Sequence, residues 1–124
     1  ILDFMRQSRI LERVNIGSVM YTVIETPIFQ RYAAEVWSNP EREDFISWIA
    51  AHPDAGDVIP HTNGLRKVRW SRTGMGKRGG ARVIYYNRLE NGYIWLLIVY
   101  TKTKFDSLPT AFLQSLREEV ENGR

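Results

Sequence analysis

Basic side chains that could hold phosphate groups recur on three predicted strands in the middle of the chain. Lys67 and Arg69 stand two residues apart in one strand, which puts them on the same face, roughly 6–7 Å apart. Arg82 opens the next strand, and we expect the two strands to pair and bring this third cation beside the first two. Lys102 and Lys104 end the last strand and extend the cluster if that strand is the next neighbour. Such a cluster could bind phosphates and stabilise developing negative charge.

A glycine-rich segment, residues 74–80, separates the first two of these strands and carries Lys77 and Arg78. Its composition is similar to that of a nucleotide-binding phosphate loop, but such a loop lies between a strand and a helix, and its lysine precedes Ser or Thr. Here a predicted strand follows the glycines, and Arg78 follows Lys77. A nucleotide hydrolase is therefore disfavoured. We expect a basic hairpin loop whose glycines let the backbone approach a phosphodiester closely.

Few other side chains could serve acid–base chemistry or stack on bases. His52 stands at a predicted helix end, where a charge–dipole contact explains its presence. His61 lies in a predicted loop near the basic strand and could act as a general base. Tyr86, Tyr100 and Phe105 could stack on nucleobases, although strand tyrosines more often belong to the core.

Composition excludes several classes of function. The chain has 124 residues, enough for one domain, and no cysteine, which excludes disulfides, thiolate metal sites and thiol nucleophiles. Glu90 is the only acid within residues 64–104, so metal binding and paired-carboxylate catalysis are disfavoured there, and we expect no cofactor. The longest apolar run, residues 93–100, is far shorter than the roughly 20 residues that span a bilayer, so we expect no membrane partner. The lack of cysteine fits a reducing compartment, and we expect a cytoplasmic location.

The distribution of charge favours a polyanionic partner. The formal net charge is only +3, yet residues 64–104 hold ten basic residues and one acid, while the rest of the chain holds seven basic and thirteen acidic residues. A segment with this excess of positive charge is a candidate nucleic-acid site. The alternative is a sheet face that charge keeps free of aggregation.

The order of predicted elements indicates an α+β domain. We expect a strand at residues 20–25, then two helices that begin at Thr26-Pro27 and Asn39-Pro40. Strands follow near residues 65–71, 81–88 and 93–102, and a last helix covers residues 109–122. The apolar character of residues 93–100 predicts a central strand, and Asn91-Gly92 predicts the hairpin that leads into it. Helices should pack on one face of a largely antiparallel sheet of about four strands.

Residues 1–19 differ from the rest of the chain and are interpreted as an N-terminal extension. The sequence opens with Ile1, so this segment is either an addition or an upstream extension, and Met20 could be the natural start. Ile10, Leu11 and Val14 have helical spacing, which predicts a short helix packed on a neighbour. We assign no function to it.

Three segments of the basic region form a distinctive set: GLRKVR at residues 64–69, GKRGGARVIYY at 76–86 and LLIVYTK at 96–102. Together they resemble the RelE/HigB superfamily of bacterial toxins, and the HigB-type branch most closely. The resemblance covers roughly residues 20–119 and implies a compact RelE-like domain over residues 20–124. It also implies the toxin of a type II toxin–antitoxin system, a ribosome-dependent mRNA endoribonuclease that inhibits translation. The implied partners are mRNA, the ribosome and a cognate antitoxin, expected to be a helix-turn-helix protein similar to HigA.

The resemblance also implies which residues are catalytic. Lys67 and Arg69 match the family's basic pair on its second strand. Arg82 matches the arginine that opens the third strand, and Lys102 matches the lysine after the last one. We expect Arg69 and Arg82 to clamp the phosphate in the transition state, and either Lys67 or Lys102 to act as base or acid. The 2′-hydroxyl of the substrate can be the nucleophile, and the cations can stabilise the phosphorane without a metal.

Four further cations are expected to bind RNA phosphates: Arg66, Lys77, Arg78 and Lys104. The two in the glycine loop match basic loop residues of the HigB-like branch. The chain departs from the family pattern at Thr101, where many members have glycine, and at Lys104, near which many have an acid. Its final helix also lacks the tyrosine that some members use, so the general base stays open. A non-catalytic RNA- or DNA-binding module, or a protein whose basic patch binds an acidic partner, would present the same face.

Overall fold

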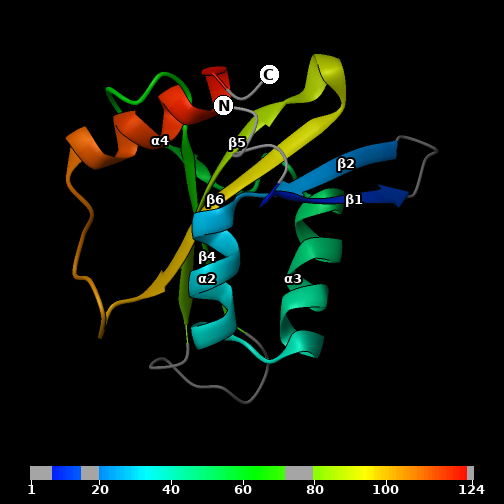
Figure 1. The fold of residues 1–124 in the computed structure, drawn as a ribbon, viewed down its shortest axis with the longest axis horizontal. Helices are drawn as coiled ribbons and strands as arrows, with labels where there is room; N and C mark the ends of the chain where they lie inside the picture. The colour runs from blue at the N-terminus through cyan, green and yellow to red at the C-terminus, as the bar shows by residue number, and fades with distance from the viewer. Residues whose placement is uncertain (1–6, 15–19, 72–79, 123–124) are drawn as a thin grey trace.

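A six-stranded sheet with helices on both faces forms the core of the protein (Figure 1). The structure, a computed structural model, describes residues 7–14, 20–71 and 80–122. The elements in chain order are β1 (Arg9–Val14), β2 (Met20–Glu25), α2 (Pro27–Val36), α3 (Asn39–Ala51), β3 (Asp57–Val58), β4 (Arg66–Trp70), β5 (Ala81–Arg88), the 3₁₀ turn η2 (Leu89–Asn91), β6 (Tyr93–Thr101) and α4 (Thr110–Asn122). The predicted α+β class is confirmed.

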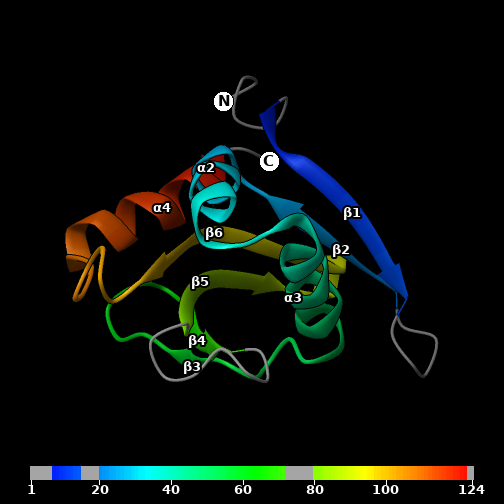
Figure 2. The same ribbon diagram turned by 90° about the horizontal axis from the view of Figure 1, so that it is seen from below.

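The strands follow the order β1-β2-β6-β5-β4-β3, which Figure 2 shows from the blue strand to the green one. β2 and β6 are parallel, and the other neighbouring pairs are antiparallel. The sheet is therefore mixed and has six strands, not the predicted four. The two additional strands are the edges β1 and β3. β6 is central and buried along its length from Ile94 to Tyr100, as its apolar sequence predicts.

The short helix predicted around residues 10–14 is wrong. Residues 9–14 form β1 instead, in antiparallel register with β2 from Arg9 opposite Glu25 to Val14 opposite Met20. Leu11 packs against the core while Ile10 is exposed, so alternate side chains of β1 point to opposite sides, as in a strand. Pairing with β2 satisfies backbone groups that a short isolated helix would leave at its ends. These residues therefore belong to the same sheet as the rest of the chain.

The helices cover both faces of the sheet and not one face as predicted. On β5, Val83 and Tyr85 belong to the core cluster that includes α2 and α3, whereas Ile84 belongs to the cluster that includes α4. In Figure 1, α2 and α3 stand side by side while α4 lies apart from them. The physical reason is the apolar strand β6. Its hydrophobic side chains point to both faces of the sheet, so each face must be covered by a helix to keep them from water.

Both predicted helix starts carry side-chain caps. The Thr26 hydroxyl accepts a hydrogen bond from the Phe29 amide at the start of α2, with Pro27 in the first turn, as predicted. At α3 the cap is Ser38, one residue before the predicted Asn39, and it forms a capping box with Glu41.

The sheet topology gathers the strand ends that carry the basic residues. β4 and β6 end where β5 begins, because both pair with β5 antiparallel. Trp70 at the end of β4 lies opposite Ala81, and Thr101 at the end of β6 lies on the other side of Ala81. This end of the sheet therefore presents the last residues of β4, the first residues of β5 and the last residues of β6 together.

Candidate nucleic-acid interface

Three cations from two neighbouring strands share one face at this end of the sheet. Arg69 on β4 is the direct cross-strand partner of Arg82 on β5. Directly opposed residues on antiparallel strands point to the same side, with Cβ atoms about 4.5–5.5 Å apart. Lys67 lies two residues from Arg69 on the same face and diagonal to Arg82, at about 7–8 Å. We call Lys67, Arg69 and Arg82 the basic cluster; the predicted approach of these three residues is confirmed.

The basic cluster lies on a largely exposed part of the sheet and forms no ion pair within the described residues. Lys67 and Arg69 are exposed and Arg82 is half-buried. Within the described ranges, no carboxylate forms an ion pair with any of the three. Like charges directly opposite each other destabilise a sheet by roughly 0.2–1 kcal/mol, so folding stability does not explain the arrangement. It suits the binding of an anion with more than one negatively charged oxygen.

Tyr100 continues the row of the arginines onto the central strand, directly opposite Arg82. Its side chain is buried and contacts Phe105 edge to face, with ring centroids 6.1 Å apart. Burial raises the pKa of the Tyr100 hydroxyl above its ordinary value, and the nearby charge of Arg82 offsets only part of that rise. The phenol is therefore neutral near pH 7, which disfavours Tyr100 as a general base. Because Tyr100 is only 2% exposed, it offers little ring surface to a stacked base.

The two lysines after β6 lie at the same end of the sheet in different settings. Lys102 is exposed and directly follows Thr101, the last residue of β6. Lys104 forms an ion pair with Glu35 of α2, with 3.8 Å between Nζ and Oε1. Lys102 is thus available to an anion near the basic cluster, whereas Lys104 is turned toward α2.

Arg66, which the sequence predicts to bind phosphate, does not join the basic cluster. It lies on the opposite face of β4, because neighbouring residues of a strand alternate in direction. Its guanidinium donates to the carbonyl oxygen of Gly56 at 2.7 Å and lies 3.7 Å from a carboxylate oxygen of Asp54. These contacts tie β4 to the loop before β3, which is a structural role.

Tyr86 is occupied by structural contacts and does not offer a stacking surface. The Arg117 guanidinium of α4 lies over its ring, 4.0 Å from the centroid, and donates to its hydroxyl at 3.0 Å. Arg88 lies 5.5 Å from the same ring. Tyr86 is four residues along β5 from Arg82, which is about 13 Å in a strand. The tyrosine therefore joins α4 to the sheet at the end away from the basic cluster.

Neither histidine reaches the basic cluster. His61 stands in a loop with a positive φ of 64°, and its carbonyl oxygen accepts from Gln114 of α4 at 2.8 Å. It thus belongs with α4, and the prediction that it could serve the basic strand as a base is not supported by its position. His52 caps α3 as predicted and stacks on Trp48, with 5.0 Å between ring centroids. Lys77 and Arg78 lie outside the described residues.

One carboxylate beside the basic cluster was missed from the sequence. Asp57 on the two-residue strand β3 is the direct cross-strand partner of Lys67, so both side chains share a face. Asp57 is exposed and is a candidate to orient the Lys67 ammonium by charge. A two-residue strand leaves no alternation to detect, so the sequence carries no signal for this pair.

No protein-family model matches the chain. Residues 7–14, 20–71 and 80–122 contain no group of three or more acidic or histidine side chains placed to hold a metal ion. Nor do the helices in these ranges include one that is long and apolar enough to cross a membrane.

Proposed function

We propose that the protein is the toxin of a type II toxin–antitoxin pair and cleaves mRNA on the ribosome. The observation that carries the proposal is the direct cross-strand pairing of Arg69 with Arg82 on a solvent-facing part of the sheet. Two guanidinium groups side by side can each form bidentate contacts with phosphate oxygens. The type of reaction is inferred from the resemblance of the basic segments to the RelE/HigB superfamily. We also propose, on the same ground, that the domain is RelE-like.

The proposed chemistry uses the 2′-hydroxyl of the RNA as nucleophile. Its oxygen attacks the adjacent phosphorus, and the bond from phosphorus to the 5′ oxygen of the next nucleotide breaks, which leaves a 2′,3′-cyclic phosphate. Arg69 and Arg82 stabilise the extra negative charge on the phosphorane. Lys67 and Lys102 are the candidates for proton transfer: a neutral amine takes the proton of the 2′-hydroxyl, and an ammonium gives one to the departing 5′ oxygen.

A toxin of this kind requires a neutralising partner. A message-cutting enzyme would arrest its own host, so we expect a small neighbouring gene whose helix-turn-helix product binds tightly. Binding must either cover the basic cluster or hold it away from the ribosome. An RNA- or DNA-binding module without catalysis would need no such partner.

Controlled expression of the chain, alone and with the product of the neighbouring gene, tests the proposal. We expect expression alone to arrest growth with cleaved messages, and co-expression to restore growth. An Arg82→Ala chain produced at the same level is the control and should be harmless. Growth arrest without message cleavage would favour a non-catalytic module, and no arrest at all would remove the toxin proposal.

A further inference from the structure

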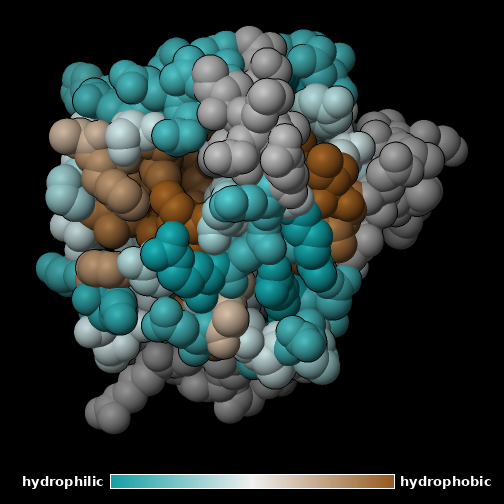
Figure 3. All heavy atoms as spheres, viewed as in Figure 1, coloured by the Kyte–Doolittle hydropathy of each residue, from teal (hydrophilic) through white to brown (hydrophobic). Residues whose placement is uncertain are grey.

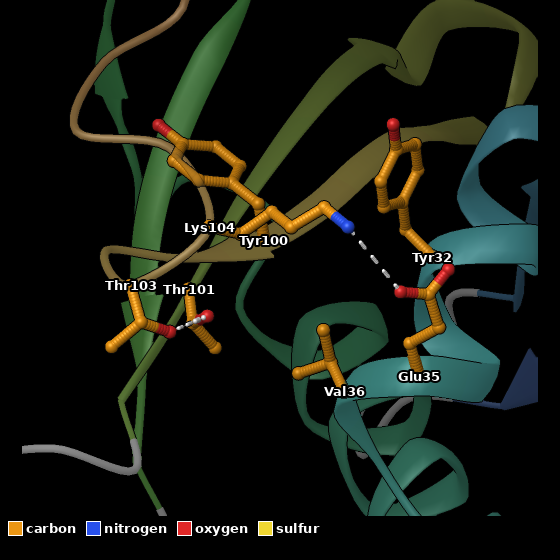
Figure 4. A pocket seen from close by; sticks show the side chains of 7 residues that line it. All are labelled: Tyr32, Glu35, Val36, Tyr100, Thr101, Thr103 and Lys104. Atoms are coloured by element: carbon orange, nitrogen blue, oxygen red, sulfur yellow. Dashed lines mark hydrogen bonds and ion pairs between the residues drawn. The ribbon is translucent and has the colours of Figure 1, made fainter.

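A pocket of about 270 Å³ opens beside the basic cluster, between the last turn of α2 and the turn that follows β6 (Figure 4). Tyr32, Glu35 and Val36 of α2 line one side, and Tyr100 and Lys104 are among the residues that line the other. In Figure 4 the Lys104 and Glu35 side chains reach toward each other across the pocket, with the two tyrosine rings on either side. The volume lies just below the range typical of drug-sized ligands, about 300–1,000 Å³, and suits one nucleobase.

The pocket joins the basic cluster through Tyr100. This residue lines the pocket and is also the direct neighbour of Arg82 across β5 and β6. When the phosphate of a nucleotide contacts Arg82, the pocket that could receive its base is therefore only one strand away from the basic cluster. Specific recognition of single-stranded RNA uses such hollows, with aromatic contacts to the base and hydrogen bonds to its Watson–Crick edge.

Glu35 stands where it does not help the helix that carries it. It lies in the last turn of α2, where the partial negative charge of the helix end disfavours an acid. Its ion pair with Lys104 is weak support, because the two side chains are 57 % and 54 % exposed and such surface pairs contribute about 0–1 kcal/mol. Helix stability therefore does not account for the carboxylate.

Hydrogen bonds hold the turn that carries Lys104, on the opposite side of the pocket. The Lys104 amide donates to the carbonyl oxygen of Thr101 at 3.0 Å, and the hydroxyls of Thr101 and Thr103 are 2.8 Å apart. The pocket thus presents a carboxylate with two acceptor oxygens and an ammonium donor on a hydrogen-bonded turn. A ligand edge that offers two donors beside one acceptor matches this pair.

We infer that this pocket binds a guanine base of the RNA. Among the four bases, guanine alone offers two adjacent donors on its Watson–Crick edge, N1–H and N2–H, next to the acceptor O6. Glu35 accepts both donors as a bidentate pair, and Lys104 donates to O6. Adenine and cytosine offer one exocyclic donor beside a ring acceptor, and uracil offers one donor between two acceptors. The inference rests on the proposed function, which makes RNA the ligand.

The test titrates the purified chain with each of the four ribonucleoside 3′-monophosphates, followed by two-dimensional NMR. We expect guanosine 3′-monophosphate to bind at least about tenfold more tightly than the other three and to shift the amides of Tyr100, Thr101 and Thr103. In Glu35→Gln the preference should disappear, because an amide has one acceptor oxygen. Equal binding of the four nucleotides, an unchanged preference in Glu35→Gln, or shifts confined to other regions would each overturn the inference.

The matched control is Glu90→Gln, which makes the same chemical change in the exposed turn η2 at the far end of the β5–β6 hairpin and should keep the preference. Because the titration needs no ribosome, it separates the two proposals. If the protein prefers guanosine monophosphate but leaves messages intact, the guanine pocket is supported and the endoribonuclease proposal is rejected. If the protein cleaves messages but shows no preference for guanine, the endoribonuclease proposal is supported and the guanine pocket is rejected.

Discussion

Arg69 and Arg82 are direct cross-strand partners on β4 and β5, and no described carboxylate forms an ion pair with either. Two like charges at this separation oppose pairing of the strands. The strands pair nonetheless, because Val68 and Val83 bury apolar surface on the other face of the same strands. Hydrophobic packing on one face thus holds a repulsive charge pair on the other, where it can meet an anion.

Removal of either arginine should abolish message cleavage and leave the fold intact. Arg69→Ala and Arg82→Ala each remove one phosphate contact and relieve one repulsion. We therefore expect the free energy of unfolding to change by less than about 0.5 kcal/mol or to rise. Growth on expression reports activity, and urea unfolding reports stability. A variant that still arrests growth would show that its arginine is not catalytic.

The control for these variants is Arg66→Ala, because Arg66 lies on the same strand but on the opposite face of the sheet. Loss of the hydrogen bond from Arg66 to the Gly56 carbonyl should lower the free energy of unfolding by about 1–3 kcal/mol. The folded fraction should still cleave messages. Loss of cleavage by a folded Arg66→Ala protein would mean that the chemistry is not confined to the face of the basic cluster.

Glu25 should be the most costly single carboxylate to remove. It is fully buried at the end of β2, where Arg42 of α3 donates to it at 2.6 Å and Arg9 of β1 also forms an ion pair with it. Glu25→Ala removes the buried carboxylate that Arg42 and Arg9 share and leaves Arg9 with its exposed partner Glu43, which should cost about 3–5 kcal/mol in urea unfolding. Glu43→Ala removes an exposed partner of Arg9, at 2.8 Å, and should cost less than about 1 kcal/mol. Similar losses in both variants would contradict the role of Glu25 in holding β1.

Tyr100 should make the protein less stable in alkali. Burial raises its pKa in the folded state above the ordinary value of 10.0. The stability that the neutral phenol contributes is therefore complete below pH 10 and is lost as the pH rises through the folded-state pKa. Urea midpoints measured from pH 7 to 11 should fall less steeply above pH 10 in Tyr100→Phe than in the wild type. Parallel falls in the two proteins would show that the phenol ionises as freely in the folded chain as in the unfolded one.

The sequence predicts well those elements whose own residues determine their environment. An uninterrupted apolar run of eight residues that follows the hairpin signal Asn91-Gly92 indicates a buried strand, which is why the central position of β6 is predictable. The approach of Arg82 to Lys67 and Arg69 follows from one strand pairing and the two-residue period of side chains. The cap at Thr26 is likewise a local hydrogen bond.

The sequence does not predict features that depend on distant partners. The apolar residues of β1 fit a helix and a strand equally well, and pairing with β2 decides between them. Arg66 and Lys67 are adjacent and both positively charged, so the sequence does not distinguish them. Only the position of Gly56 in the fold shows that the Arg66 side chain makes a structural hydrogen bond. The guanidinium over Tyr86 comes from Arg117, thirty-one residues away in sequence, so no local sequence pattern predicts this contact.

The toxin proposal is tested most sharply by comparing cleavage of one message free in solution and on translating ribosomes. The basic cluster can hold phosphate and stabilise charge, but cleavage also requires that the flexible RNA strand be held in line for attack. The ribosome fixes the message and removes that entropic cost. We expect the purified chain to cut the message on ribosomes, with cutting that weakens steeply as salt rises, and to leave the free message intact. Equal cleavage of free and ribosome-bound message would contradict a ribosome-dependent toxin and identify a self-sufficient ribonuclease.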